Sequence, residues 1–303
     1  MTTPLLASTR AELADLLSAA RREGQTVGFV PTMGALHEGH ASLMRVARER
    51  VGPGPLVVSV FVNPLQFGAG EDLDRYPRTL AADLDVCKAE GVDIVFAPSV
   101  EEVYPGGEPA VTVDPGPLAD VLEGQVRPGH FRGVLTVVAK LFGLVRPDVA
   151  VFGQKDYQQL ALIRRMVADL CLGVEVVGAE TVREDSGLAL SSRNRYLDAD
   201  QRESALALSR ALIRAREHGA EGAEAALANA RADLRSAHGV DLDYLVITTP
   251  ELEELPADLA PGTEGRILIA ARVGSTRLID NMPIHFTTPA GTPAGSTTEE
   301  GSS

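Results

Sequence analysis

The stretch TVGFVPTMGALHEGH, residues 26–40, decides how the first part of the chain folds. It opens with the apolar run 26–30, which has the pattern of a short buried strand, and we expect Pro31 to end that strand. A helix-like pattern follows over about 39–50. A strand that passes through a polar, glycine-containing loop into a helix is the repeating unit of a parallel α/β sheet.

The same alternation of strand and helix continues over the first two thirds of the chain. The expected strands are continuous apolar runs, which is typical of a sheet covered by helices on both faces. The sequence therefore predicts an α/β fold with a parallel sheet. The expected strands are 56–62, 92–97, 149–152 and 174–177, and the expected helices are 80–90, 134–145 and 158–170.

The composition changes after residue 181. Residues 198–237 are rich in Ala, Arg and Glu, and they predict two helices broken near Gly219. Strand-like runs follow at 242–247 and 266–273, so we expect a smaller α+β domain here.

The end of the sequence is Thr, Pro, Gly, Ser and Glu with almost nothing apolar. Such a segment cannot bury enough surface to offset the entropy of ordering it. We therefore expect a first domain at 1–181, a second domain at 182–287 and a disordered tail at 288–303.

The composition of the 303 residues excludes several classes of protein. Hydrophobic residues make up 45% and charged residues 23%, as in an ordinary globular protein. The formal net charge is −14, which argues against a general nucleic-acid-binding protein. No apolar run approaches the ~20 residues of a membrane span, and no signal peptide is recognisable. Cys87 and Cys171 are too few for a disulfide scaffold, so we expect a cytoplasmic protein. From the net charge and the lack of a long apolar run, we expect neither a nucleic-acid nor a membrane partner.

The loop at 31–40 is the strongest candidate site. Gly34 and Gly39 permit a close approach of the backbone to a ligand, and the free N–H groups of the following helix favour phosphate. His37 and His40 share one face of a helical turn, where both could donate to phosphate oxygens. Two other interpretations stay open, a metal-binding pair and a structural pair. The metal pair is weakened because His40 comes one residue too early for the H-E-x-x-H pattern.

Three more segments carry polar groups, although each by itself could be an ordinary surface turn. Phe152–Gln159 follows an expected strand and contains Lys155, a compact cation that suits phosphate. Ser191-Ser192-Arg193 offers hydroxyl groups and a guanidinium group to phosphate oxygens. Phe61–Phe67 brings the amides of Asn63 and Gln66, which suit a substrate with hydroxyl or carboxylate groups.

Together these motifs resemble one family. The series P-T-M-G-A-L-H-x-G-H, F-V-N-P-x-Q-F, F-G-x-K-D-Y-Q-Q and S-S-R-N-x-Y-L is similar, in order and spacing over about residues 20–285, to the pantothenate synthetases (pantoate–β-alanine ligases). An H-x-G-H motif alone would indicate only the wider superfamily of nucleotidyltransferases and class I aminoacyl-tRNA synthetases. The resemblance implies a Rossmann-like N-terminal domain, a smaller C-terminal lid domain and a homodimer. It also implies that ATP and Mg²⁺ are used to condense pantoate with β-alanine through a pantoyl adenylate, with release of AMP and pyrophosphate.

The resemblance also implies roles for individual residues. His40, usually described as a proton donor, would act in catalysis with His37 and Lys155. Asn63, Gln66 and Gln159 would bind pantoate, and Gln66 would also help to place β-alanine. The residues expected to bind ATP are Met33, Gly34, His37, His40, Gly153, Lys155, Asp156, Val182, Leu190, Ser191, Ser192 and Arg193.

The chain departs from the family pattern at three places. Gln154 and Leu190 replace Glu and Met of many members, and neither change removes a phosphate-binding group. Some relatives carry adjacent acidic residues, linked to magnesium, where this chain has Ala82 and Asp83. Asp83 is then the one expected protein ligand, and Mg²⁺ would be held mainly by ATP and water. The alternatives are a nucleotidylyltransferase acting on a phosphorylated acceptor and a non-catalytic nucleotide-binding protein.

Overall fold

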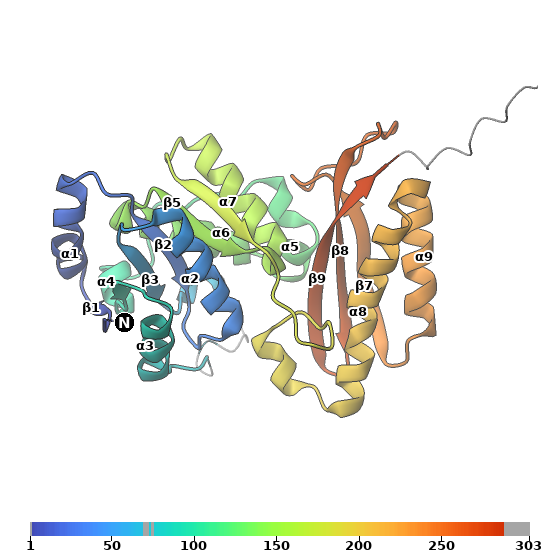
Figure 1. Cartoon of the computed structure of the whole chain (residues 1–303), viewed down its shortest axis with the longest axis horizontal. Coiled ribbons are helices and arrows are strands. Elements are labelled where there is room, and N and C mark those ends of the chain that lie inside the picture. The colour runs from blue at the N-terminus through green and yellow to red at the C-terminus, as the bar shows by residue number, and fades with distance from the viewer. Residues whose placement is uncertain (1, 69–72, 74–75, 288–303) are drawn as a thin grey trace, which may run out of the picture. The chain divides into compact units, whose positions relative to one another are not determined.

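The structure, a computed structural model, describes residues 2–68, 73 and 76–287 (Figure 1). Within those residues no helix is long and apolar enough to cross a lipid bilayer. The chain forms two compact units, an N-terminal unit of residues 1–194 and a C-terminal unit of residues 195–303. The division follows Asn194 and not residue 181, since Leu190 still packs beside Gly39 of the N-terminal unit. The expected tail at 288–303 lies outside the described residues.

The N-terminal unit is built on a six-stranded parallel sheet of order β1-β4-β3-β2-β5-β6. From β2 the chain adds strands first on one side and later on the other, so β2 and β5 flank the point where the strand order reverses. Ligands of such sheets bind at this point, beyond the carboxyl ends of the strands. The strands are β1 (Leu5–Ala7), β2 (Gly28–Thr32), β3 (Leu56–Val60), β4 (Ile94–Phe96), β5 (Val149–Gly153) and β6 (Glu175–Ala179).

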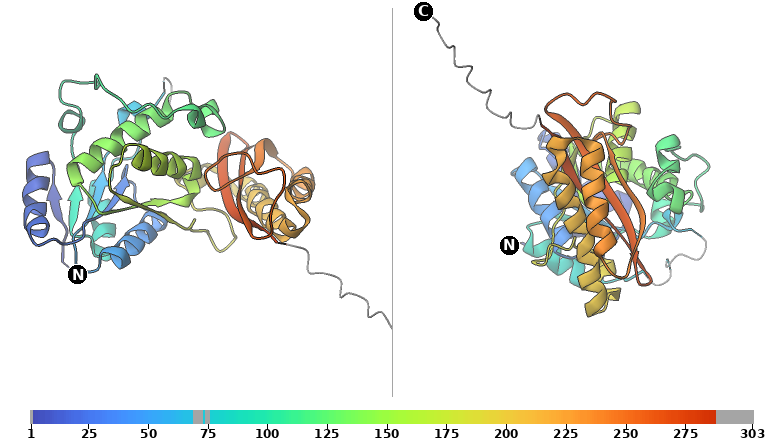
Figure 2. Two further views of the ribbon diagram at one scale, coloured as in Figure 1. Left: turned by 90° about the horizontal axis from the view of Figure 1, so that it is seen from above. Right: turned by 90° about the vertical axis from the view of Figure 1, so that its right-hand side faces the viewer.

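Helices cover both faces of this sheet, as Figure 2 shows. On one face the ring of Phe142 from α6 lies 6.3 Å from the ring of Phe29 and 6.3 Å from that of Phe152. On the other face Val30 joins Met44 of α2 in a buried cluster. Phe29 and Val30 are neighbours in β2 and point to opposite faces, so both faces carry apolar residues and no alternation with polar residues is seen. The helices are α1 (Arg10–Arg22), α2 (Glu38–Val51), α3 (Leu80–Ala89), α4 (Val100–Val103), α5 (Glu123–Val126), α6 (His130–Val145) and α7 (Tyr157–Asp169).

One expectation about β2 is wrong. The strand does not end before Pro31, which pairs with Ser59 of β3. The carbonyl of Thr32 accepts a hydrogen bond from Phe61, on the β3 side, so Pro31 faces the β5 side. Proline has no N–H to donate there, and the ladder between β2 and β5 ends earlier, at Phe29 and Ala150. Pro31 therefore ends one ladder of the strand and leaves the other intact.

The C-terminal unit is α+β, as expected. Its antiparallel sheet has the order β7-β8-β9, with β7 (Val240–Thr248), β8 (Thr263–Val273) and β9 (Thr276–Phe286). Two helices, α8 (Ala199–Glu217) and α9 (Ala223–Ser236), pack side by side against this sheet (Figure 2). The fold class that the sequence predicts, a parallel α/β sheet with a smaller α+β part, is confirmed.

Candidate active site

The loop between β2 and α2 is held in an unusual backbone conformation. Gly34 and Ala35 both have positive φ, at 83° and 52°. The Thr32 hydroxyl donates to the carbonyl of Ser59 at 2.6 Å and accepts the N–H of Gly34 at 3.2 Å. The loop turns sharply after β2 and delivers His37 to the N-terminus of α2.

His37 and His40 cap the helix with their own ring nitrogens. Nδ1 of His37 accepts the N–H of Gly39 at 3.1 Å, and Nδ1 of His40 accepts the N–H of His37 at 3.3 Å. The two ring centroids lie 4.2 Å apart. An imidazole that accepts through Nδ1 and is neutral carries its proton on Nε2, so each ring has an Nε2–H donor.

The surroundings keep both rings neutral. The pKa of His40 is lowered to about 4, chiefly by burial and then by the neighbouring His37, while Asp156 opposes both effects. Burial also lowers the pKa of His37, followed by the positive charge of Lys155. At pH 7 the pair is therefore a set of two neutral N–H donors beside a lysine.

A second loop begins where β5 ends at Gly153. The 3₁₀ turn Gln154–Asp156 follows, and Nζ of Lys155 lies 3.9 Å from the carboxylate of Asp156. The Lys155 side chain is 18% exposed and that of Asp156 is 55% exposed, so water reaches the carboxylate. Lys155, and then Arg193, lowers the pKa of Asp156, and the loss of water on the side that faces the protein opposes them. The end of β5 thus carries a lysine and an ionised carboxylate next to the histidine pair.

A third loop, residues 182–194, completes the cationic side of the site. It closes on itself, because Leu190 donates its N–H to the carbonyl of Val182 at 2.9 Å. The buried amide of Asn194 donates to Glu184 and to the carbonyl of Ala189, each at 3.0 Å. The Ser191 hydroxyl accepts the N–H of Arg193 at 3.2 Å, while Ser192 and Arg193 are exposed.

Two side-chain amides follow β3, those of Asn63 and Gln66, and they differ in how many hydrogen bonds they make within the protein. The Asn63 side chain is 1% exposed, donates to Gln66 and to the carbonyl of Gly133, and accepts from Tyr104 and Leu65. These four bonds use its full capacity, so Asn63 orients Gln66 and has no group left for a ligand. Gln66 is half-buried, and its Nε2 lies 3.0 Å from the sulfur of Met33, which joins this turn to the loop after β2.

Arg127 and His130 extend this part of the site. Nδ1 of His130 donates to the carbonyl of Gln66 at 2.9 Å, and its Nε2 accepts from Arg127 at 3.0 Å. Both side chains also lower the pKa of Asp156. A role for Arg127 was not predicted from the sequence. The signal was the run Arg-Pro-Gly-His at 127–130, in which Gly129 adopts a φ of 81° directly before α6.

The two glutamines at the start of α7 differ in their surroundings. Gln159 lies half-buried in the first turn of α7. Its neighbour Gln158 is 3% exposed and donates to the carbonyls of Leu118 and Val121 at 2.8 and 2.9 Å. Gln158 thus holds the segment before α5, and the pair Gln-Gln of the motif consists of one structural and one half-buried amide.

A metal-binding interpretation gains nothing from the geometry. Among the described residues no group of three or more His, Cys, Asp or Glu side chains could hold a metal ion. Nδ1 of each histidine already accepts a backbone N–H. Asp83, the expected ligand of Mg²⁺, is 1% exposed and accepts the N–H groups of Ala35 and Leu36 at 3.2 and 2.8 Å. A carboxylate surrounded by N–H donors does not fit a metal ligand.

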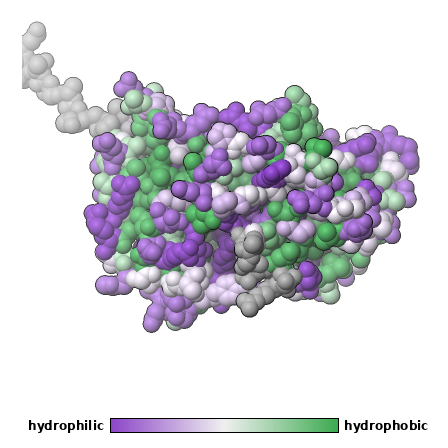
Figure 3. Space-filling model, turned by 180° about the vertical axis from the view of Figure 1, so that it is seen from behind, coloured by the Kyte–Doolittle hydropathy of each residue, from purple (hydrophilic) through white to green (hydrophobic). Residues whose placement is uncertain are grey.

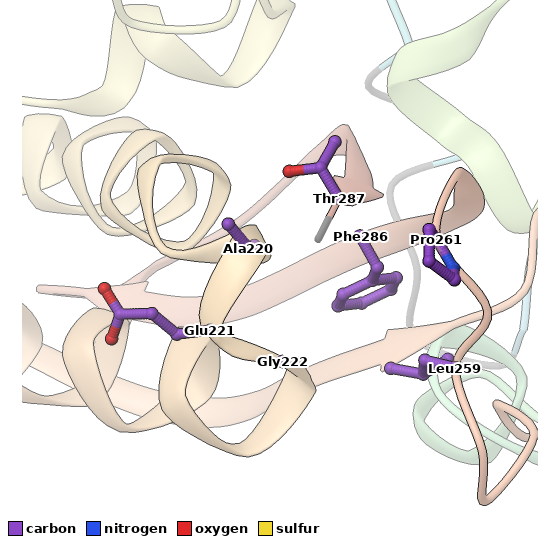
Figure 4. A pocket seen from close by; sticks show the side chains of 8 residues that line it. Ala220, Glu221, Gly222, Leu259, Pro261, Phe286 and Thr287 are labelled. Atoms are coloured by element: carbon purple, nitrogen blue, oxygen red, sulfur yellow. The ribbon is translucent and has the colours of Figure 1, made fainter. Parts of the chain in front are cut away.

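The C-terminal unit has a pocket of its own, about 280 Å³ in volume, and Figure 4 shows its lining. Leu259, Pro261 and Phe286 make it largely apolar. Its one charged side chain, Glu221, lies 2.7 Å from Nδ1 of His218. None of the residues predicted to bind substrates lines this pocket, so the loops of the N-terminal unit remain the candidate site.

Residues 5–283 match the family model of the pantoate–β-alanine ligases. The chain belongs to this family. It is 75% identical to a pantothenate synthetase from a Nocardioides species, over 95% of this chain and 88% of the relative. The pantothenate synthetase of Thermus thermophilus has a similar structure, with a TM-score of 0.82 and 50% identity, over 92% of this chain and 98% of that one. The pantoate–β-alanine ligase of Francisella tularensis, complexed with β,γ-ATP and β-alanine, matches with a TM-score of 0.73 and 34% identity, over 92% and 97%.

Membership in the pantoate–β-alanine ligases confirms the family that the four motifs indicated, and with it that the chain is an enzyme. The roles of the individual residues stay predictions. The geometry adds that the polar residues predicted for the site are of two kinds. Some, such as Lys155 and Gln66, border the site, whereas Asn63 and Asp83 are buried and hold the loops in place.

Proposed function

We propose that the chain condenses pantoate with β-alanine while ATP is cleaved to AMP and pyrophosphate, and that a pantoyl adenylate is the intermediate. The observation that carries this proposal is the neutral histidine pair next to Lys155, beyond the carboxyl ends of β2 and β5. Its family and the Francisella relative complexed with β,γ-ATP and β-alanine support it as well.

ATP would bind with its phosphates at the N-terminus of α2. The positive end of the α2 dipole favours an anion, and the Nε2–H groups of His37 and His40 can donate to phosphate oxygens without a charge change. Lys155 and Arg193 would neutralise charge on the α-phosphate and on the departing pyrophosphate. In a chain of net charge −14 this local group of donors must outweigh the general field.

The two chemical steps balance with these groups in place. A carboxylate oxygen of pantoate bonds to the α-phosphorus while the bond to the pyrophosphate oxygen breaks. The amine nitrogen of β-alanine then bonds to the acyl carbon, AMP leaves with that carboxylate oxygen, and the surplus proton of the amine goes to solvent. Gln66 and Gln159 would orient pantoate, and Gln66 would help to place the amine.

Magnesium does not fit the protein ligand that the sequence suggested, because the carboxylate of Asp83 is buried and directed at backbone N–H groups. We therefore propose that Mg²⁺ enters with ATP, held by phosphate oxygens and water, as its reluctance to lose water allows. None of the steps above assigns a protein ligand to the ion.

We further propose a homodimer, a lid role for the C-terminal unit, and a cytoplasmic location. The family resemblance supports the first two, and two free cysteines, one of them exposed, fit a reducing compartment. Leu5 and Leu6 of the edge strand β1 are 56% and 46% exposed. Figure 3 shows further apolar side chains among polar ones on one face of the molecule, and such surfaces could take part in a dimer interface. Light scattering on a sizing column checks the dimer, for which a mass of twice 32.0 kDa is expected.

The reaction is tested with ATP, Mg²⁺ and pantoate, with and without β-alanine, by mass spectrometry of AMP and pantothenate. Equal amounts of the two products, dependent on both substrates, are expected. Pantoate with ¹⁸O in its carboxylate should transfer one label to each AMP, because an adenylate passes that oxygen to phosphorus. AMP without label contradicts the adenylate. A stable dinucleotide instead of AMP would indicate a nucleotidylyltransferase, and binding without turnover a non-catalytic protein.

Lys155→Met tests the role of the lysine in this scheme. We expect turnover to fall about 10²–10³-fold, the scale of losing one group that stabilises the transition state. The pKa of His37 should rise toward its ordinary value, because Lys155 is one cause of its depression; histidine NMR titration measures this. Lys88→Met, on the exposed side of α3, is the matched control and should change neither quantity. Near-normal turnover in Lys155→Met would remove the residue from the mechanism.

A further inference from the structure

Asp83 is a buried carboxylate whose partners are all hydrogen-bond donors. It lies in the first turn of α3 and is 1% exposed. Its oxygens accept the N–H of Ala35 at 3.2 Å and the N–H of Leu36 at 2.8 Å, and the Thr79 hydroxyl lies 3.3 Å from each oxygen. A buried carboxylate requires such partners, and here the loop after β2 supplies them.

One of the residues that donate to Asp83, Ala35, has a strained backbone. Gly34 and Ala35 are consecutive residues with positive φ, a conformation that an alanine Cβ disfavours. A Cβ built on Gly34 would lie 3.0 Å from Oδ2 of Asp83, so the carboxylate packs directly against the turn. Successive N–H groups in such a turn form a concavity that binds an anion, and the carboxylate fills it. Asp83 thus stabilises a turn that the sequence alone would not favour.

The turn sets the position of the histidine pair. Leu36, which donates to Asp83, directly precedes His37, the N-cap residue of α2. The N–H of His37 is in turn the partner of Nδ1 of His40. A loop released from Asp83 would move the N-cap and, with it, both Nε2–H groups.

We propose that Asp83 is a positioning residue, which fixes the turn at 34–36 so that His37 and His40 present their Nε2–H groups, and that it is not a ligand of Mg²⁺. Mg²⁺ requires near-octahedral oxygen ligands at about 2.1 Å and keeps several waters, whereas the carboxylate of Asp83 is buried and faces the N–H groups of the turn and the Thr79 hydroxyl. Ala82, the neighbouring position, has no oxygen on its side chain. The catalytic consequence rests on the proposed function, whereas the structural part does not.

The variant Asp83→Asn tests this, with Asp85→Asn as the matched control. Asp85 is on the same helix and exposed, so its variant removes the same charge without touching the loop. Three quantities are measured: hydrogen exchange of the Ala35 and Leu36 amides by NMR, Mn²⁺ affinity without nucleotide by electron paramagnetic resonance, and kcat over a range of Mg²⁺ concentrations.

In Asp83→Asn we expect the exchange of both amides to accelerate at least about tenfold, since the amide side chain offers one acceptor oxygen and not two. Binding of Mn²⁺ without nucleotide should be as weak in the variant as in the wild type, and kcat should fall about 10–100-fold with an unchanged Mg²⁺ dependence, as a misplaced group predicts. Asp85→Asn should match the wild type in all three. If even the wild type makes no pantothenate, the proposed function fails, and amide exchange still decides the role of Asp83.

A ligand of the metal would behave differently. Mn²⁺ affinity would then fall about 10–100-fold, excess Mg²⁺ would restore kcat, and exchange at Ala35 and Leu36 would not change; this result overturns the proposal. If Asp83→Asn does not fold, the wild-type protein without nucleotide decides. Coordination of a cation by a carboxylate packed against the turn would weaken its bonds to the two amides, so faster exchange on addition of Mg²⁺ would overturn the proposal, and unchanged exchange supports it.

Discussion

His37 and His40 each use Nδ1 to accept a backbone N–H. In each ring Nδ1 therefore has a structural role, and Nε2–H is the group left for the reaction. Two substitutions of His40 separate the two roles. The oxygen of Asn can replace Nδ1, so His40→Asn should keep the cap and lose the Nε2–H donor. The amide of Gln reaches the place of Nε2, so His40→Gln should keep a donor and lose the cap.

We expect His40→Asn to lower kcat about 10²–10³-fold with a nearly unchanged melting temperature. His40→Gln should lose less activity and more stability, by about 1 kcal/mol, the usual effect of losing a cap. Steady-state kinetics and thermal unfolding of the purified variants measure both. The reverse ranking would mean that Nδ1, and not Nε2, is the reactive atom.

The low pKa of His40 also makes stability depend on pH. A histidine with a folded-state pKa of about 4 binds more protons when the chain unfolds, so acid favours unfolding. The penalty is absent above its ordinary pKa of about 6.5, grows as the pH falls, and is complete below about 4. His37, whose pKa is also lowered, acts in the same direction.

Between pH 7 and 4.5 the wild type should therefore lose more free energy of unfolding than His40→Asn, by up to about 3 kcal/mol. Urea unfolding at several pH values measures the difference, in which the titration of the carboxylates largely cancels. Parallel curves for the two proteins would show that His40 is not held neutral by the fold.

The functional groups of single residues could be predicted from the sequence, but the tertiary contacts of those groups could not. His37, Lys155 and Gln66 follow strand ends in the sequence, and the parallel topology brings strand ends to one edge. By contrast, Asn63 and Asp83 carry the same functional groups as ligand-binding residues, yet they are buried and bonded to partners far away in the sequence, such as Tyr104 and Leu36. Such bonding depends on tertiary packing, which the spacing of a motif does not contain.

At the scale of elements, α6 positions the turn that carries Gln66. Position 133 of α6 accommodates only glycine, because a Cβ on Gly133 would lie 2.2 Å from the carbonyl oxygen of Leu65. The carbonyl of Gly133 also accepts from Asn63, which holds Gln66. The helix and the turn are therefore packed backbone against backbone.

Gly133→Ala should separate the two elements, raise KM for pantoate and lower the melting temperature. Gly143→Ala is the matched control on the same helix, because a Cβ there meets nothing within 4 Å. Since alanine favours a helix over glycine by about 0.5–1 kcal/mol, this control should be neutral or slightly stabilising. Equal behaviour of the two variants in kinetics and thermal unfolding would contradict the role assigned to Gly133.

Element boundaries show where sequence patterns reach their limit. The pattern of α2 predicts the helix to within one residue at each end, because its start coincides with the motif and its apolar face is regular. The sequence does not predict strand β9, although it is as long as β8. Its sequence mixes Arg277, Asp280 and Asn281 with apolar residues, and pairing with β8, not local propensity, makes it a strand.

For the whole molecule, the question is how much of the chain the enzyme needs. The family match ends at residue 283, and the last strand ends at Phe286, whose carbonyl accepts the N–H of Gly262 at 2.7 Å. Residues 288–303 follow both ends and contain almost no apolar side chains. They therefore have little with which to stabilise either unit.

A chain that ends at Thr287 should keep the kcat and melting temperature of the full chain. The matched control ends at Asp280 and removes the β9 residues from Asn281 to Phe286, which pair with β8. That deletion takes away buried side chains such as Ile284 and should lower the melting temperature markedly. Loss of activity in the first truncation, with its circular dichroism and melting temperature unchanged, would mean that the last sixteen residues take part in the reaction.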